Sequence, residues 1–153
     1  MKWCVFQMIK IICVGKIKEK YLDSFIEDYK TRISAYHKIE IIELKDSNIE
    51  LESKEILSRI NDKDFNIIMD IKGKKYDSIE FSKLIDNTFT NGYGTITFII
   101  GASNGVTEEV KNKCNLRLSF SDMTFPHGLF RGILLEQIYR SFKILNKKSY
   151  HYL

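Results

Sequence analysis

The segment that decides the fold is Thr95-Ile96-Thr97-Phe98-Ile99-Ile100-Gly101-Ala102-Ser103-Asn104-Gly105. Its first six residues are β-branched or aromatic and form the strongest strand signal in the chain. The strand leads directly into a glycine-containing turn, and ligands of open parallel sheets bind at that edge. The turn matches neither the dinucleotide fingerprint nor the P-loop, and such turns are more often structural. The segment therefore predicts a central strand with a candidate ligand loop at its end.

Strands and helices alternate on both sides of this segment. We expect strands at 9–14, 39–44, 65–71, 95–100 and 116–120. We expect helices near 21–33, 50–61 and 78–90, a short one capped by Thr107, and one over 126–145. This order predicts a single α/β domain over residues 1–153, with a mainly parallel five- to six-stranded sheet and helices on both faces.

The last expected helix is apolar around most of its circumference, so it must be covered on two sides. The sheet would cover one side, and a second copy of the chain is a plausible cover for the other. Gly128 and Gly132 are unexpected in this helix and would permit close packing, again with a partner copy. Glu136 and Arg140 lie on its polar face, where they could form a surface ion pair.

Composition and charge constrain the class of protein. The chain has 153 residues, of which 44% are hydrophobic, and its net charge is +4. Residues 126–153 hold five basic residues and one acidic residue, so they carry the whole excess. This terminal segment suits a polyanionic partner, although a solvated helix face and tail would look the same. No stretch is long and apolar enough for a membrane span.

The three cysteines do not suggest a disulfide framework or a zinc site, because their number is odd and their spacing is wide. Cys13 lies in an apolar run and is expected to be a buried thiol. Cysteine usage favours a cytoplasmic protein. The histidines are scattered and no acidic cluster accompanies them, so we expect no metal site.

A second candidate segment is Ser119-Phe120-Ser121-Asp122-Met123-Thr124-Phe125-Pro126-His127-Gly128, between a strand and the last helix. His127 could simply have a backbone partner at the start of that helix, or it could contact RNA or support a ligand loop. No nucleophile with a nearby base emerges, and nothing supports Ser-His-Asp catalysis.

Six segments, taken in their order along the chain, resemble those of a known family. They are Ile11-Ile12-Cys13-Val14-Gly15-Lys16, Asp70-Ile71-Lys72-Gly73-Lys74, Phe98-Ile99-Ile100-Gly101-Ala102-Ser103-Asn104-Gly105, Met123-Thr124-Phe125-Pro126-His127, Leu134-Leu135-Glu136-Gln137-Ile138-Tyr139-Arg140 and Tyr150-His151. Together they closely resemble the ribosomal RNA large subunit methyltransferase H family of the SPOUT class. The resemblance covers residues 8–151, and residues 1–7 read as an extension before an alternative start at Met8.

The resemblance implies a SPOUT fold with a C-terminal trefoil knot over about residues 95–153, an exception to unthreaded chains. It implies a homodimer that uses S-adenosyl-L-methionine to methylate N3 of a pseudouridine in 23S rRNA of the assembled ribosome. Carried over by position, the cofactor-binding residues would be Met69, Gly101, Phe120, Ser121, Asp122, Met123, Thr124 and Phe125.

The resemblance also places Arg140, Tyr150 and His151 at the catalytic, substrate side, where one subunit's tail would complete the other's site. We expect His151 to accept the N3 proton and Arg140 to stabilise negative charge on the base or hold phosphate. Two departures stand out: related sequences often have a second glycine at Ala102 and a basic residue after Tyr-His, where this chain has Tyr152. Methylation of another RNA nucleotide and a non-catalytic ribosome-associated module remain alternatives.

Overall fold

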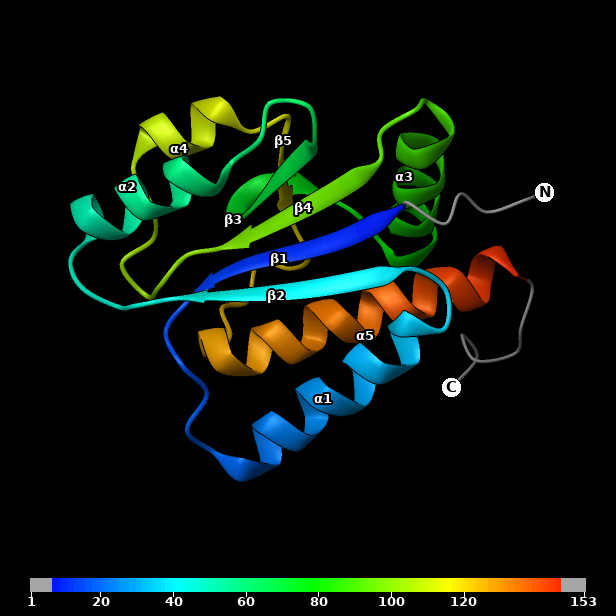
Figure 1. The fold of residues 1–153 in the computed structure, drawn as a ribbon, viewed down its shortest axis with the longest axis horizontal. Coiled ribbons are helices and arrows are strands. Elements are labelled where there is room, and N and C mark those ends of the chain that lie inside the picture. The colour runs from blue at the N-terminus through cyan, green and yellow to red at the C-terminus, as the bar shows by residue number, and fades with distance from the viewer. Residues whose placement is uncertain (1–6, 147–153) are drawn as a thin grey trace.

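A computed structural model describes residues 7–146 of the chain, and in it five strands form one parallel sheet (Figure 1). The strands are β1 (Met8–Val14), β2 (Lys38–Leu44), β3 (Phe65–Lys75), β4 (Thr95–Ile100) and β5 (Leu116–Ser119). Their spatial order is β2-β1-β4-β3-β5, and every pairing is parallel. The predicted parallel α/β architecture is confirmed, with five strands.

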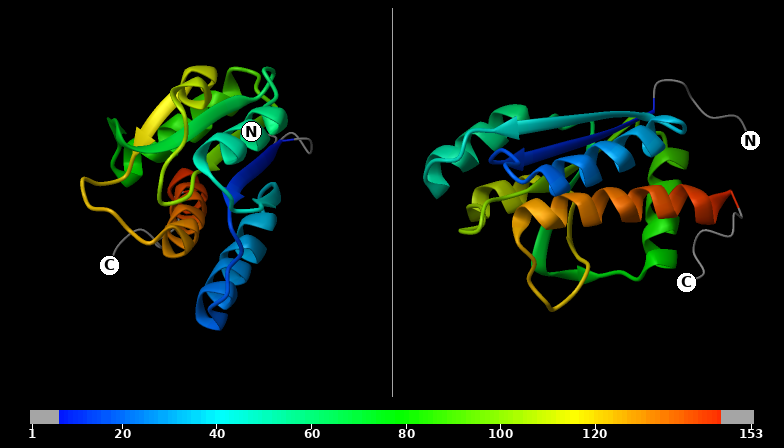
Figure 2. Two further views of the ribbon diagram at one scale, coloured as in Figure 1. Left: turned by 90° about the vertical axis from the view of Figure 1, so that its left-hand side faces the viewer. Right: turned by 90° about the horizontal axis from the view of Figure 1, so that it is seen from below.

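Helices cover both faces of the sheet, as predicted (Figures 1 and 2). They are α1 (Lys20–Ser34), α2 (Ile49–Arg59), α3 (Ser78–Thr90), α4 (Glu108–Lys113) and α5 (His127–Leu145). Neighbouring strand residues point to opposite faces. Ile11 therefore belongs to the apolar core shared with α1, α3 and α5, whereas Ile12 belongs to the smaller core under α2 and α4. Cys13 is fully buried, as expected.

The breadth of the apolar surface of α5 has an explanation within the chain. α5 lies between α1 and α3 and also packs on the sheet, so its own chain covers three of its sides (Figure 2). A β-carbon at Gly132 would collide with the ring of Phe25 of α1, and one at Gly128 would lie 3.4 Å from the Leu22 side chain of α1. The two glycines therefore admit α1 of the same chain, which corrects our interpretation of them as contacts with a second copy.

Strand β3 is longer than predicted because it contains a bulge. Met69 and Lys74 both pair with Leu118 of β5, so residues 70–73 loop out between them. Gly73 permits this fold-back, since a β-carbon there would lie 2.6 Å from the carbonyl of Arg117. Bulges of this kind redirect side chains next to functional sites.

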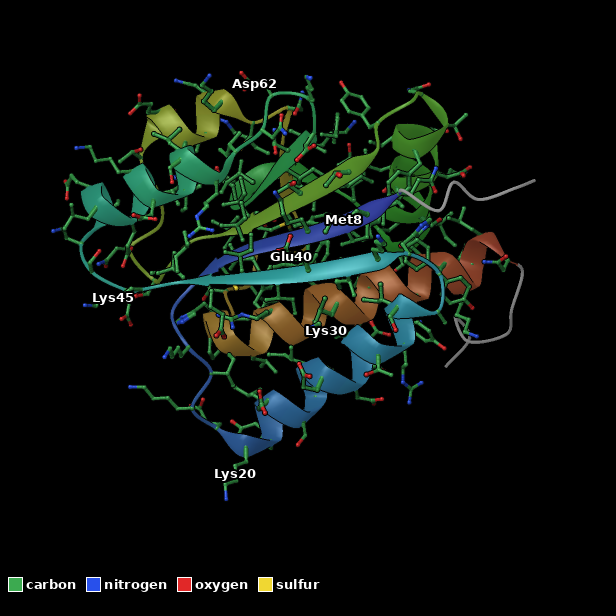
Figure 3. All side chains as sticks on the ribbon, viewed as in Figure 1. Met8, Lys20, Lys30, Glu40, Lys45 and Asp62 are labelled. Atoms are coloured by element: carbon green, nitrogen blue, oxygen red, sulfur yellow. The ribbon has the colours of Figure 1, made fainter. Side chains whose placement is uncertain are left out.

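Charged side chains project from the outer surface, as Lys20 at the start of α1 illustrates (Figure 3). None of the helices in the described part of the chain is both long and apolar enough to cross a membrane. Strand order and pairing do not determine how the chain threads, so the C-terminal knot stays a prediction.

Candidate ligand site at the carboxyl end of the sheet

A cavity of about 720 Å³ opens at the bulge of β3 and at the carboxyl ends of β4 and β5. Its lining comes from the β3 bulge, the turn after β4, the loop between β5 and α5, and Lys111 of α4. Open parallel sheets bind ligands at this edge, and the volume lies within the range of small-molecule sites.

Seven of the eight residues predicted to bind the cofactor line this one cavity. They are Met69, Gly101, Phe120, Ser121, Met123, Thr124 and Phe125. The eighth, Asp122, does not line it and instead pairs with Lys75 at 2.5 Å (Nζ to Oδ1) on the surface. The structure thus brings together three segments that are more than fifteen residues apart in the sequence.

Aromatic rings form one wall of the cavity. Phe120 and Phe130 lie with their ring centroids 5.5 Å apart, and Phe125 stacks on Phe130 at 6.2 Å. Met123 and Phe125 are exposed for large apolar side chains, at 73% and 38%. Apolar walls with an exposed rim suit a flat, partly apolar ligand such as a purine.

The loop between β5 and α5 is held by one serine. The carbonyl of Ser121 accepts a hydrogen bond from the Ser119 hydroxyl at 3.0 Å. The hydroxyl of Ser121 accepts one from the Met123 amide, also at 3.0 Å. Because these groups are engaged in folding the loop, Ser121 shapes this part of the cavity wall.

The turn after β4 is a tight one. The Gly105 amide donates to the Ala102 carbonyl at 2.8 Å, and Gly105 has φ +79°. A β-carbon at Gly101 would lie 2.8 Å from a methyl of Val106, so this glycine is required by the turn itself. The methyl group of Ala102 packs against the α2–α4 core, which accommodates the departure from a second glycine.

Besides His127, two ionisable side chains line the cavity: Asp70 in the bulge and Lys111 of α4. Their Oδ2 and Nζ atoms are 3.3 Å apart, and the Asp70 side chain is 10% exposed. Burial by itself would raise the pKa of Asp70. The Lys72 amide, which donates to Oδ1 at 3.0 Å, and the Lys111 ammonium outweigh burial, so the pKa lies below its ordinary value. Asp70 is therefore a carboxylate at neutral pH.

Arg140 lies outside this cavity. It follows His127 by thirteen residues, which is about 20 Å along a helix. Its Nη2 pairs with Oε2 of Glu136 at 2.7 Å, so the expected ion pair exists and is largely buried. Tyr150 and His151, the other two predicted catalytic residues, lie outside the described residues.

Arg131 was missed by sequence reasoning. Its side chain is fully buried at the start of α5, where Nη1 donates to Glu43 Oε2 at 2.6 Å and Nη2 donates to the Gly15 carbonyl at 3.1 Å. It thereby ties α5 to the ends of β1 and β2. Part of the basic excess of residues 126–153 is thus internal and paired. His127, which lines the cavity, lies beside the same Gly15.

Within the described part of the chain, no three His, Cys, Asp or Glu side chains come close enough together to hold a metal ion. The site is a mainly apolar cavity with one charged end, formed by Asp70 and Lys111. Residues 8–151 match the family described as Predicted SPOUT methyltransferase, which assigns the chain to the SPOUT class of methyltransferases.

Relatives with known names define the family more closely. A "Ribosomal RNA large subunit methyltransferase H" of Clostridium botulinum (strain 657 / Type Ba4) is 50% identical over 156 residues, covering 94% of this chain and 98% of that protein. One of the same name from Streptococcus pneumoniae (strain CGSP14) is 46% identical with the same coverage. The chain therefore belongs to the ribosomal RNA large subunit methyltransferase H family.

Solved structures support the fold. A probable methylase family protein from Haemophilus influenzae Rd KW20 aligns with a TM-score of 0.59 at 10% identity, covering 97% of this chain and 72% of that one. A probable methyltransferase from Bordetella pertussis Tohama I aligns with a TM-score of 0.56 at 11% identity, covering 90% and 95% of the two chains. At such identities these likenesses concern the fold alone.

Proposed function

We propose that this protein uses S-adenosyl-L-methionine to methylate N3 of a pseudouridine in 23S rRNA on the assembled ribosome, acting in the cytoplasm as a homodimer. The observation that carries the proposal is the convergence of seven of the predicted cofactor-binding residues on one cavity. The names of the relatives at 46–50% identity support an RNA substrate.

The cavity fits this cofactor in volume and in chemistry. Its aromatic and methionine wall suits adenine, the backbone of the 119–126 loop suits hydrogen bonding to ring nitrogens, and the charged end suits polar groups. When bound, the cofactor supplies an electrophilic methyl group on a sulfonium. The task of the protein is then to align the base, to exclude water and to accept one proton.

The position of Arg140 favours a site shared between two subunits. Because Arg140 is about 20 Å along α5 from His127, it is too distant to act at the cavity of its own chain. A partner copy would bring its own Arg140, Tyr150 and His151 to that cavity. We assign His151 the role of proton acceptor, Arg140 the role of stabilising negative charge on the base, and Tyr150 a supporting role there.

The test combines three measurements on the purified chain. Calorimetry should show binding of S-adenosyl-L-methionine, the mass in solution should be that of a dimer, and methyl groups should be transferred to ribosomes from a strain lacking the mark. Mapping the product distinguishes pseudouridine N3 from another nucleotide. A folded dimer that binds no cofactor, with or without ribosomes, would favour a non-catalytic module, and a monomer would refute the shared site.

A further inference from the structure

The Asp70–Lys111 pair has no assigned role in methyl transfer in the function proposed above, yet it forms the charged end of the cavity. Asp70 is held rigidly, because it belongs to the bulge that returns to β5 at Lys74 and because the Lys72 amide and Lys111 fix its two oxygens. A buried, oriented carboxylate in the wall of an otherwise mainly apolar cavity is costly unless it is paired or used.

The charges around Asp70 alternate in sign outward from the cavity. Lys111 Nζ is also 3.8 Å from Glu108 Oε2, and Glu108 is 3.4 Å from Arg117. The outer members are much more exposed than Asp70, so water screens them more strongly. Asp70 is thus the most buried charge of the network, and it lines the cavity together with Lys111.

The ligand and the product of the proposed reaction differ mainly in one charge. When the methyl group moves from sulfur to N3, the sulfur–carbon bond breaks, a nitrogen–carbon bond forms, and the N3 proton leaves to an acceptor. The electron pair of the broken bond stays on sulfur, so S-adenosylhomocysteine carries a neutral thioether where S-adenosylmethionine carries a sulfonium. Discrimination between the two therefore depends on the electrostatic potential in the cavity.

We propose that the Asp70 carboxylate makes the cavity prefer the sulfonium ligand over its thioether product, which promotes exchange of product for fresh cofactor. This inference rests on the proposed function. It does not require direct contact with sulfur, because removing one unit charge about 10 Å away at an effective dielectric constant near 20 changes a binding constant by roughly tenfold. Lys111 offsets part of the field of the carboxylate, so the tenfold figure is the difference between Asp70 and asparagine at this position. Lys111 acts as a positioning residue that holds the carboxylate in place.

Calorimetric titration of the full chain with S-adenosylmethionine and with S-adenosylhomocysteine tests this inference. For Asp70→Asn, we expect the affinity for S-adenosylmethionine to fall about tenfold and that for S-adenosylhomocysteine to fall less than about threefold. A merely structural role would weaken both ligands equally. Equal losses, or an unchanged ratio of the two dissociation constants, would overturn the inference.

Two further variants keep the test decisive. Asp62→Asn makes the same chemical change on the surface, where Asp62 faces Lys113 at 3.7 Å, and should leave the ratio unchanged (Figure 3). Lys111→Met removes the positive partner but keeps the carboxylate, so the preference for S-adenosylmethionine should persist or rise. A fall in that preference would refute the inference even if Asp70→Asn failed to fold. If the unaltered chain bound neither ligand, the proposed function itself would fail.

Discussion

The buried pair of Arg131 and Glu43 leads to an asymmetric prediction for stability. The Arg131 side chain is 2% exposed, whereas that of Glu43 is 38% exposed. Glu43→Gln leaves a guanidinium buried without its counter-charge, and the Gly15 carbonyl, a neutral acceptor, keeps its hydrogen bond to Arg131. Breaking a buried pair in this way costs about 3 to 5 kcal/mol, and the retained amide oxygen puts our expectation at about 3 kcal/mol.

The reverse change should cost less. Arg131→Met fills a similar volume with apolar atoms, and water can solvate the Glu43 carboxylate that remains. The main loss is the hydrogen bond to the Gly15 carbonyl, so we expect about 1 to 2 kcal/mol. In the double variant no buried charge is left unpaired. It should therefore be more stable than Glu43→Gln alone, although it carries one substitution more.

Urea unfolding followed by circular dichroism at pH 7.5 measures these differences, provided that the free energy of unfolding falls with urea concentration at the same slope in all variants. A suitable control is Asp28→Asn, which breaks the exposed pair with Arg32 and should cost less than about 1 kcal/mol. Additive losses in the double variant would refute the reasoning, because they would mean that the burial of Arg131 does not determine the cost.

Three further predictions concern other parts of the fold. Burial lowers the pKa of His37 from 6.5 to about 4, so protonation of this imidazole favours the unfolded chain. The free energy of unfolding should therefore fall by up to about 3 kcal/mol between pH 6.5 and 4, and His37→Phe should remove that dependence in urea titrations. Gly73→Ala should cost about 1 to 3 kcal/mol by thermal unfolding, because its β-carbon would meet the backbone of Arg117, whereas Gly94→Ala points into open space and should change stability by less than about 0.5 kcal/mol. Asp77→Ala removes the capping box of α3 and should cost about 1 kcal/mol, and no loss in chemical denaturation would contradict that role.

Local patterns predicted the sheet best where a strand is a short, apolar run with clear ends, as β4 is. The strand at 95–100 and the helix at 78–90 have the predicted bounds, and both are flanked by glycine or by a capping residue. Thr107 occupies the predicted N-cap position of α4 without a side-chain capping bond, and its own amide donates to the hydroxyl of Ser53. Periodicity thus identified the elements, while details of their ends depended on neighbours distant in the sequence.

The features that sequence reasoning missed all depend on tertiary pairing. The bulge at 70–73 exists because two residues of β3 share one partner in β5. Arg131 is buried because Glu43, 88 residues away, meets it. The breadth of α5 suggested a partner copy, whereas α1 and α3 account for much of it. The residues predicted to bind the cofactor were selected from the family resemblance, because no local pattern reports which loops meet at one end of a sheet.

The place of α5 between α1 and α3 has a consequence for biosynthesis. The apolar side of α1 is complete once residue 34 has been made, but α5, the helix that covers it, begins only at residue 127. At about 5 to 20 residues per second, translation needs roughly 5 to 20 s to produce the 92 residues between them. Throughout that interval the nascent chain exposes a surface suited to chaperones or to aggregation. Completion of the core must therefore wait for the last described helix, so this fold cannot mature progressively from its N-terminus.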